Sequence, residues 1–286
     1  MVRLSLFRSS QMNVDVCFSP KALTEDAVKG KIVVVIDVLR ACSTIVTALA
    51  HGAREVFPVA DRGEAGRVAA QLDPETSLLG GEQGGQRIEG YGAGNSPLEY
   101  EPMLVAGKIV VLTTSNGTRA FTSLKGPAET VVGCFLNLSR VVDFLRELDE
   151  QTNGVDENPH VLILCVGHDG CAALEDVLCA GMILHRLWSG RAPSGLADGA
   201  RIALTQYRSV HSRLARSLFN CAHTQRLIAL GFGDDVAYCA RVDAIPLLPR
   251  YDENLLILDV ADKERARELV SALPENEEEL AEAIEV

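Results

Sequence analysis

The chain alternates between short apolar runs and longer amphipathic segments over most of its length. The run KIVVVI at Lys31–Ile36 is continuous and rich in β-branched residues, which is typical of a strand buried on both faces. The segment that follows it, Cys42–Ala50, has the spacing of a helix and is closed by Gly52. The same alternation recurs along the chain, so the pattern predicts repeated strand–loop–helix units.

The apolar runs predict strands, and the amphipathic segments predict helices. The strands are Val14–Phe18, Lys31–Ile36, Glu55–Val59, Ser77–Leu79, Lys108–Leu112, Thr130–Val132, Val161–Val166 and Leu255–Leu258. The helices are Cys42–Ala50, Gly63–Leu72, Gly117–Leu124, a segment from Asn137 to about Leu148, and Ala173–Leu187, with a mostly helical remainder. This order predicts an α/β fold of three α/β/α layers around a mostly parallel or mixed sheet. In such sheets ligands bind outside the carboxyl ends of the strands.

Domain organisation follows from the same pattern. Residues 1–260 are predicted to form one catalytic unit, and a boundary between two lobes near residues 190–200 is an open alternative. Residues 261–286 are predicted to form an acidic, helical C-terminal segment. Its glutamates are interpreted as a solvated helix face and not as a metal site; they are Glu275, Glu277, Glu278, Glu279, Glu282 and Glu285.

Composition narrows the classes of function. The 286 residues are 47% hydrophobic and 23% charged, which is typical of a globular chain with a large core. The formal net charge of −12 disfavours binding to nucleic acid or to an anionic membrane, and the 5% aromatic content disfavours base stacking. The eight cysteines contain no CxxC pair, and no stretch of 18 apolar residues is present. A cytoplasmic protein with reduced thiols is therefore predicted.

The loop after Lys31–Ile36 carries the first candidate chemistry. Asp37 leaves an apolar strand, Arg40 follows it, and the hydroxyls of Ser43 and Thr44 lie at a helix start. A carboxylate in this position suits a hard cation, and an arginine suits a phosphoryl or sulfonate oxygen. The alternative is a capping aspartate beside a surface arginine.

A second polar loop follows the strand at Lys108–Leu112. It consists of Thr113, Thr114, Ser115, Asn116, Gly117 and Thr118. Hydroxyls and free backbone N–H groups at the start of a helix are suited to bind an anion, and Asn116 is a candidate for the helix cap. The alternative is an ordinary polar turn.

Three further loops add polar groups. Gly80–Pro97 holds seven glycines in eighteen residues and contributes Glu82, Arg87, Asn95 and Ser96. A loop so rich in glycine is uncommon without a function. The remaining two are Gly133–Asn137, with Asn137 as a candidate ligand, and Gly167–Gly170. Glu175 and Asp176 open the helix after the last loop and point about 100° apart, which predicts that one of them faces a cleft and the other is a solvated surface acid.

Several common signatures are absent or weak. The glycines at Gly90–Gly94 have GxGxG spacing without the strand and helix of a dinucleotide site. A haloacid-type DxD, a GxSxG and a P-loop are missing. Cys134 and Arg140 have the C-x5-R spacing of cysteine-dependent phosphatases, but the intervening residues are bulky and lack glycine. We interpret that spacing as coincidence.

Taken in order, these segments resemble the 2-phosphosulfolactate phosphatase family. The similar segments are IDVLRACSTIVTAL at Ile36–Leu49, GGEQGGQRIEGYGAGNSPLE at Gly80–Glu99, TTSNGTRA at Thr113–Ala120, GCFLN at Gly133–Asn137, LEDVLCAG at Leu174–Gly181 and, more weakly, GFGDDVAYCARVD at Gly231–Asp243. The resemblance extends to about Val260. It implies an α/β/α fold and a Mg²⁺-dependent hydrolase that converts 2-phospho-3-sulfolactate to 3-sulfolactate and phosphate, on the route to coenzyme M.

The residues fit that implication. A substrate with phosphate, sulfonate and carboxylate groups needs several cationic subsites, for which Arg40, Arg87 and Arg119 are candidates. The predicted metal ligands for Mg²⁺ are Asp37, Glu82, Glu175 and Asp176, and the catalytic acids are Asp37, Glu175 and Asp176.

Three alternatives stay open: a phosphatase of the same fold for another small phosphorylated acid, a cysteine-dependent phosphatase using Cys134, and a non-catalytic anion-binding module. The apolar C-terminal helices also suggest a homodimer.

Overall fold

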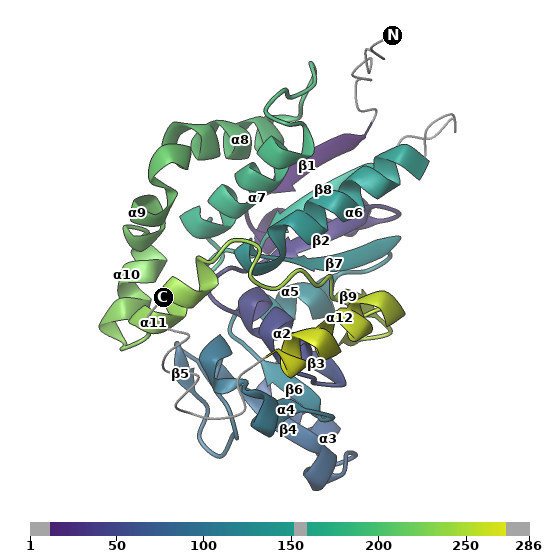
Figure 1. Cartoon of the computed structure of the whole chain (residues 1–286), viewed down its shortest axis with the longest axis vertical. Coiled ribbons are helices and arrows are strands. Elements are labelled where there is room, and N and C mark those ends of the chain that lie inside the picture. Colours follow the sequence, from purple (N-terminus) through teal and green to yellow (C-terminus); the bar gives the residue numbers. More distant parts are fainter. Residues whose placement is uncertain (1–11, 152–158, 273–286) are drawn as a thin grey trace.

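Residues 12–151 and 159–272 are described by the computed structural model, shown in Figure 1. The strands are β1 (Asn13–Cys17), β2 (Ile32–Ile36), β3 (Glu55–Val59), β4 (Ser77–Gln83), β5 (Gln86–Arg87), β6 (Ile109–Thr113), β7 (Glu129–Gly133), β8 (His160–Cys165), β9 (Arg250–Asp252) and β10 (Leu255–Ile257). The longer helices are α2 (Ala41–Ala50), α3 (Arg62–Ala69), α6 (Leu138–Gln151), α7 (Leu174–Leu187), α8 (Asp198–Val210), α10 (Ala222–Ala229) and α12 (Val260–Ser271). The shorter helices are α1 (Glu25–Val28), α4 (Pro102–Val105), α5 (Gly117–Ser123), α9 (Leu214–Phe219) and α11 (Gly233–Cys239).

The predicted strands and helices are confirmed, with ends that shift mostly by one or two residues. The prediction for Ser77–Leu79 was too short, because β4 continues to Gln83 through the first two glycines of the glycine-rich loop. The short strands β5 and β9 were not predicted. β5 follows a turn at Gly84 and Gly85, where both backbones adopt positive φ angles that favour glycine.

Ten strands of the described ranges form one mixed sheet in the order β1-β8-β2-β7-β9-β10-β3-β6-β4-β5. The strands β1, β8, β2 and β7 are parallel to one another, and so are β3, β6 and β4. Between these two blocks, β9 and β10 make three successive antiparallel pairings. The two parallel blocks therefore run in opposite directions, and the α/β prediction with a mixed sheet is confirmed.

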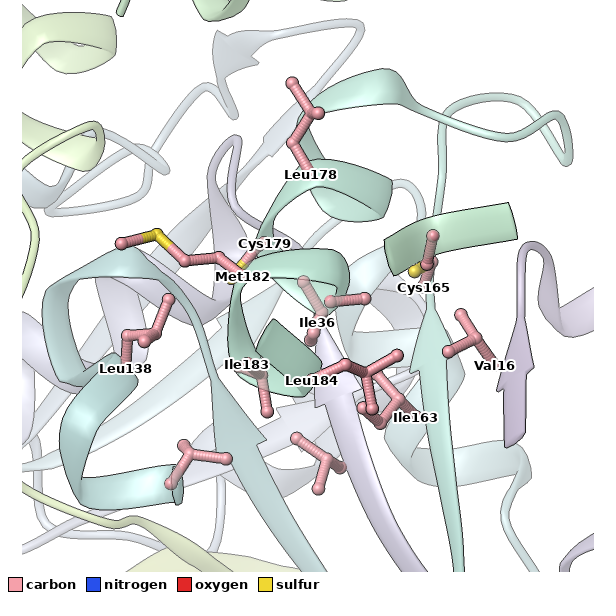
Figure 2. Packing of buried hydrophobic residues seen from close by; sticks show 14 of the residues in the cluster. Val16, Ile36, Leu138, Ile163, Cys165, Leu178, Cys179, Met182, Ile183 and Leu184 are labelled. Carbon is pink, nitrogen blue, oxygen red and sulfur yellow. The ribbon is translucent and has the colours of Figure 1, made fainter. Parts of the chain in front are cut away.

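Helices cover both faces of the sheet. Val34 and Ile36 of β2 pack into one core with α6, α7 and α8, whereas Val33 and Val35 pack into the other with α2 and α5. Successive side chains of a strand point to opposite faces, so the continuous apolar run of β2 serves both cores. Figure 2 shows Ile183 and Leu184 of α7 beside Ile36 and Ile163 of the strands. In Figure 1, α8, α9, α10 and α11 follow one another along one side of the molecule.

The C-terminal helix α12 is joined to the body of the protein. Asp259 caps it by accepting a hydrogen bond from the backbone N–H of Asp262, and buried Asp262 accepts one from the N–H of Leu248. The acidic run predicted at Glu275–Glu285 lies outside the described residues, and the separate C-terminal segment stays a prediction. No helix in the described ranges is long and apolar enough to cross a membrane.

We expect the contact between α7 and α8 to be sensitive to a single methyl group. A Cβ atom added at Gly181 would lie 2.2 Å from the backbone oxygen of Ala203 and 2.6 Å from Cβ of Tyr207. Gly181→Ala should therefore lower the free energy of unfolding by about 1–3 kcal/mol, because the two helices must separate. Gly66→Ala in α3 is the matched control, since its Cβ meets open space and should be neutral or stabilising by up to about 1 kcal/mol. Urea titrations that gave both variants the same midpoint would contradict this packing argument.

Candidate active site

A pocket lies where the carboxyl ends of both parallel blocks meet. Loops that follow β2 and β8 come from one block, and loops that follow β4 and β6 come from the other. In a flat sheet these ends would lie on opposite edges, but strand twist accumulates across the intervening strands and turns one block relative to the other. The predicted residues that line the pocket are Asp37, Arg40, Glu82, Asn95, Thr114, Ser115, Asn116 and Gly117.

Asp37 is the central acid of the pocket. Its Oδ1 accepts a hydrogen bond of 3.3 Å from the N–H of Ala41 at the start of α2, and its side chain is buried. Burial raises the pKa of Asp37 to about 7, and the charges of Glu82 and Glu175 act in the same direction, while nearby His223 opposes the shift. A carboxyl group with this pKa changes protonation state near neutral pH.

The loop after β6 is packed directly against Asp37. A Cβ atom at Gly117 would lie 2.3 Å from Cβ of Ala41 and 2.6 Å from Oδ2 of Asp37, so only glycine permits this approach. Thr114 and Thr118 hold the turn, because each backbone N–H donates to the hydroxyl of the other at 2.9 Å. Asn116 is the N-cap residue of α5, as predicted, but its side chain makes no cap hydrogen bond.

Glu82 joins two loops of the pocket. Its Oε2 accepts from the N–H of Gly85 and its Oε1 from the N–H of Ser115, both at 2.7 Å. The carboxylate thereby fixes the β4–β5 turn against the loop after β6. Beside it, Asn95 has a buried Oδ1 atom that lacks a hydrogen-bond partner within the described chain. A buried acceptor without a partner in a pocket is a position that a ligand or water can satisfy.

Arg40 is fixed by a group that was not predicted from the sequence. Its Nη1 lies 2.5 Å from Oδ2 of Asp235 in α11, and its Nη2 donates to the carbonyl oxygen of Gly85 at 2.9 Å. The guanidinium carbon is 4.1 Å from the ring centroid of Phe232. Ser96 donates to the other oxygen of Asp235 at 2.7 Å. Breaking such a buried ion pair from one side typically costs about 3–5 kcal/mol, so Asp235 ties α11 to the pocket.

Glu175 and Asp176 are both buried, which corrects the prediction that one of them is a solvated surface acid. Asp176 accepts from the N–H groups of Val38 and Gly167, each at 2.9 Å, and so connects the loops after β2 and β8. Glu175 accepts at 2.9 Å from Nδ1 of His223. Neither acid lines the pocket itself; Asp176 braces its loops and Glu175 acts on it through His223.

A group of imidazoles and an arginine completes the pocket wall. His168 of the loop after β8 stacks on His223 of α10 with ring centroids 4.1 Å apart, and Nη1 of Arg226 lies 3.0 Å from Nε2 of His168. From the sequence, α10 was predicted only as part of a helical remainder. A detectable signal was present, because His223, Arg226, Leu227 and Leu230 have the i, i+3, i+4, i+7 spacing of one helix face and all line the pocket.

The other predicted ligands do not line the pocket. Four of them are buried and make hydrogen bonds within the protein: Ser43, Thr44, Ser96 and Thr118. Thr113 is buried at the end of β6. Asn137 accepts from the N–H and the thiol of Cys134 and donates to the carbonyl oxygens of Val132 and Leu247, which leaves no capacity for a ligand. Arg87 is 57% exposed near Glu99, and Arg119 is exposed and donates to the carbonyl oxygen of Ala60.

The cysteine-dependent alternative finds no support in this geometry. Cys134 is fully buried, and burial raises the pKa of its thiol to about 12, so the nucleophilic thiolate is disfavoured. Arg140 lies 3.6 Å from the carboxylate of Asp262 and does not line the pocket. The C-x5-R spacing is therefore coincidental in this fold.

The acids fit a loosely held Mg²⁺ ion better than an enclosed metal cage. Within residues 12–151 and 159–272, no three His, Cys, Asp or Glu side chains are grouped so as to hold a metal. Glu82 and Asp176 already use both oxygens on backbone N–H groups. Asp37 faces the pocket with Oδ2 outside its hydrogen bond to Ala41. Mg²⁺ commonly keeps several waters and uses one or two carboxylates together with substrate phosphate, and Asp37 suits that mode.

Comparison with known proteins supports the family resemblance seen in the sequence. The family model described as 2-phosphosulpholactate phosphatase matches residues 17–254. A relative from Pseudothermotoga lettingae, named "Probable 2-phosphosulfolactate phosphatase", is 40% identical over 245 residues, covering 85% of this chain and 98% of the relative. Relatives of the same name from Caldanaerobacter subterraneus and Thermotoga maritima are 35% and 37% identical, covering 82% and 86% of this chain and 93% and 98% of their own lengths.

The raised pKa of Asp37 predicts how its replacement affects stability. An unfolded aspartate titrates near 3.9, so between that pH and about 7 the native protein retains a proton that the unfolded chain has lost. The stability supplied by protonated Asp37 is complete below about pH 4 and is lost as the pH rises through 7. In EDTA, Asp37→Asn should therefore melt roughly 5 °C or more above the wild type at pH 8, and the gap should narrow at pH 5. Thermal melts showing an equal gap at both pH values would contradict the burial effect.

Proposed function

Because the chain belongs to the 2-phosphosulpholactate phosphatase family, we propose that it hydrolyses 2-phospho-3-sulfolactate to 3-sulfolactate and inorganic phosphate. The relatives named for this activity align with this chain over nearly their whole length. The observation that supports it most directly is the close packing of Gly117 against Asp37, which places an acid beside a polar strand-end loop in one pocket. A role on the route to coenzyme M is part of the same proposal.

The chain's own residues are assigned distinct tasks in this proposal. The phosphoryl group binds at the end of the pocket formed by Asp37 and the loop from Thr114 to Gly117. Glu82 keeps that loop in place through its bond to the N–H of Ser115. Rigid positioning of this kind supplies much of the rate enhancement in phosphoryl transfer, where the transition state requires alignment and charge stabilisation.

Mg²⁺ is proposed as the cofactor, with Asp37 as its protein ligand. Burial, with a smaller contribution from the charges of Glu82 and Glu175, raises the pKa of Asp37 in the metal-free protein, and a cation beside these carboxylates would relieve their repulsion. When bound, the ion would offset negative charge on the phosphoryl oxygens during cleavage. A protein with a net charge of −12 has particular need of such a local cation to hold an anionic substrate.

Phosphate release from 2-phospho-3-sulfolactate tests this assignment. We expect release by the wild type with Mg²⁺, and its loss when EDTA removes the metal. Asp37→Asn should lower kcat by about a hundredfold or more while the protein stays folded, since the group that acts on the phosphoryl end is removed. Cys134→Ser is the matched control and should retain the wild-type kcat, because the buried thiol lies away from the pocket.

Each contradictory outcome points to a different error. Activity that persists after verified removal of metal would overturn Mg²⁺ as the cofactor. Full activity in Asp37→Asn would overturn the role of that carboxylate. A wild-type enzyme that releases no phosphate under either condition would overturn the substrate.

A further inference from the structure

Arg226 differs from the other arginine that lines the pocket. The guanidinium of Arg40 is buried in its ion pair with Asp235 and also donates to Gly85. Arg226 is half exposed, and its nearest carboxylate is that of Asp169 at 3.9 Å, on a side chain that is 73% exposed to solvent. An exposed pair at this distance is weak, so Arg226 keeps most of its charge and donors for a ligand.

A neutral hydrogen-bond acceptor orients Arg226. Its Nη1 donates to Nε2 of His168, and an imidazole nitrogen that accepts a hydrogen bond carries no proton. His168 thus directs the arginine without cancelling its charge. The exposed carboxylate of Asp169 lies 3.4 Å from the same imidazole nitrogen and 3.9 Å from Nη1 of Arg226, and solvent screens it. Burial and the neighbouring His223 lower the pKa of His168, which keeps the ring in its neutral form.

The position of His168 is itself fixed. Its loop contains Gly167 and Gly170, which have φ angles of 72° and 77°. A Cβ atom at Gly167 would lie 2.0 Å from the carbonyl oxygen of Cys171, and one at Gly170 would lie 2.2 Å from the side chain of Lys21. The backbone of His168 is also bridged to Cys171 in both directions at 3.0 Å. The imidazole therefore projects from a closely packed loop and not from a free one.

The stacked ring on the other side is held equally well. The ring of His223 stacks on that of His168, and its Nδ1 donates a hydrogen bond to the buried carboxylate of Glu175. The contacts run in sequence from Glu175 through His223 and His168 to Arg226. Protein side chains that are already held by rigid partners lose little conformational freedom when they bind a ligand, which raises affinity.

We propose that Arg226, oriented by His168 and His223, is the subsite for the second anionic group of the substrate, the sulfonate or carboxylate that is not cleaved. This inference rests on the proposed function and extends it to the direction in which the substrate lies. The phosphoryl group faces Asp37 and the loop from Thr114 to Gly117, and the retained anion faces α10. Arginine suits such a group, because its planar N–H donors match pairs of carboxylate or sulfonate oxygens.

Binding of the product tests the subsite apart from catalysis. 3-Sulfolactate carries the sulfonate and the carboxylate but no phosphoryl group, so calorimetry in EDTA measures the proposed contact alone. Arg226→Gln should weaken its binding by about tenfold to a hundredfold, and Arg226→Lys should restore part of the loss, since it keeps the charge without the planar donors. Arg216→Gln, on the exposed face of α9, is the matched control and should bind like the wild type. Absence of binding to the wild type, or equal binding by Arg226→Gln, would overturn the subsite.

Kinetics separate a failure of the subsite from a failure of the proposed function. For Arg226→Gln, kcat/KM for 2-phospho-3-sulfolactate relative to that for p-nitrophenyl phosphate, which lacks a second anion, should fall at least tenfold, chiefly through KM. An equal loss on both esters would overturn the subsite, because the arginine would then act on the phosphoryl group. A wild type that cleaves only p-nitrophenyl phosphate would overturn the proposed substrate, while the calorimetric result still decides the subsite.

Discussion

The hydrogen bonds that buried carboxylates require determine how the loops around the pocket are arranged. Asp37, Glu82, Glu175 and Asp176 all lie buried around one pocket. An isolated buried charge costs far more than a domain's net stability, so each acid must find donors or give up its charge. Glu82 and Asp176 find them in backbone N–H groups, and one oxygen of Glu175 bonds to His223. These bonds connect loops from different strands, so satisfying the acids also assembles the pocket.

Burial raises the pKa of both Asp176 and Asp37, but of these two acids only Asp37 lines the pocket. Its one hydrogen bond within the described chain is a long contact to the N–H of Ala41, and its pKa rises to about 7. The other three acids position loops and helices, whereas this one is left poorly stabilised beside the ligand space. A metal ion or a proton from the substrate can stabilise the Asp37 carboxylate where the protein does not. Acids with shifted pKa values cluster at functional sites for that reason.

The sequence predicts local features of this structure well and long-range ones poorly. The run at Lys31–Ile36 identified β2, because a strand buried on both faces needs continuous apolar residues. The polar residues at its end identified Asp37 and Arg40 as pocket residues. No local pattern could show that Arg40 pairs with Asp235, 195 positions away, or that β9 and β10 reverse the direction of half the sheet. Asn137 was predicted as a ligand because a buried structural amide and a ligand-binding amide look alike in sequence.

The pocket combines side chains from both parallel blocks of the sheet and from the helices that follow α8. Loops from the β3–β6–β4 block bring Glu82 and the Thr114–Gly117 turn, whereas β2 and β8 bring Asp37 and His168. The helices after α8 then close the same space with His223, Arg226 and, through Arg40, Asp235. In our proposal the acids act on a metal-bound phosphoryl group and Arg226 binds a second anion, so the two tasks fall to different parts of the chain. A small molecule that carries a phosphate and a separate acid group has charges that match both parts, whereas a phosphate ester without a second charged group matches only one.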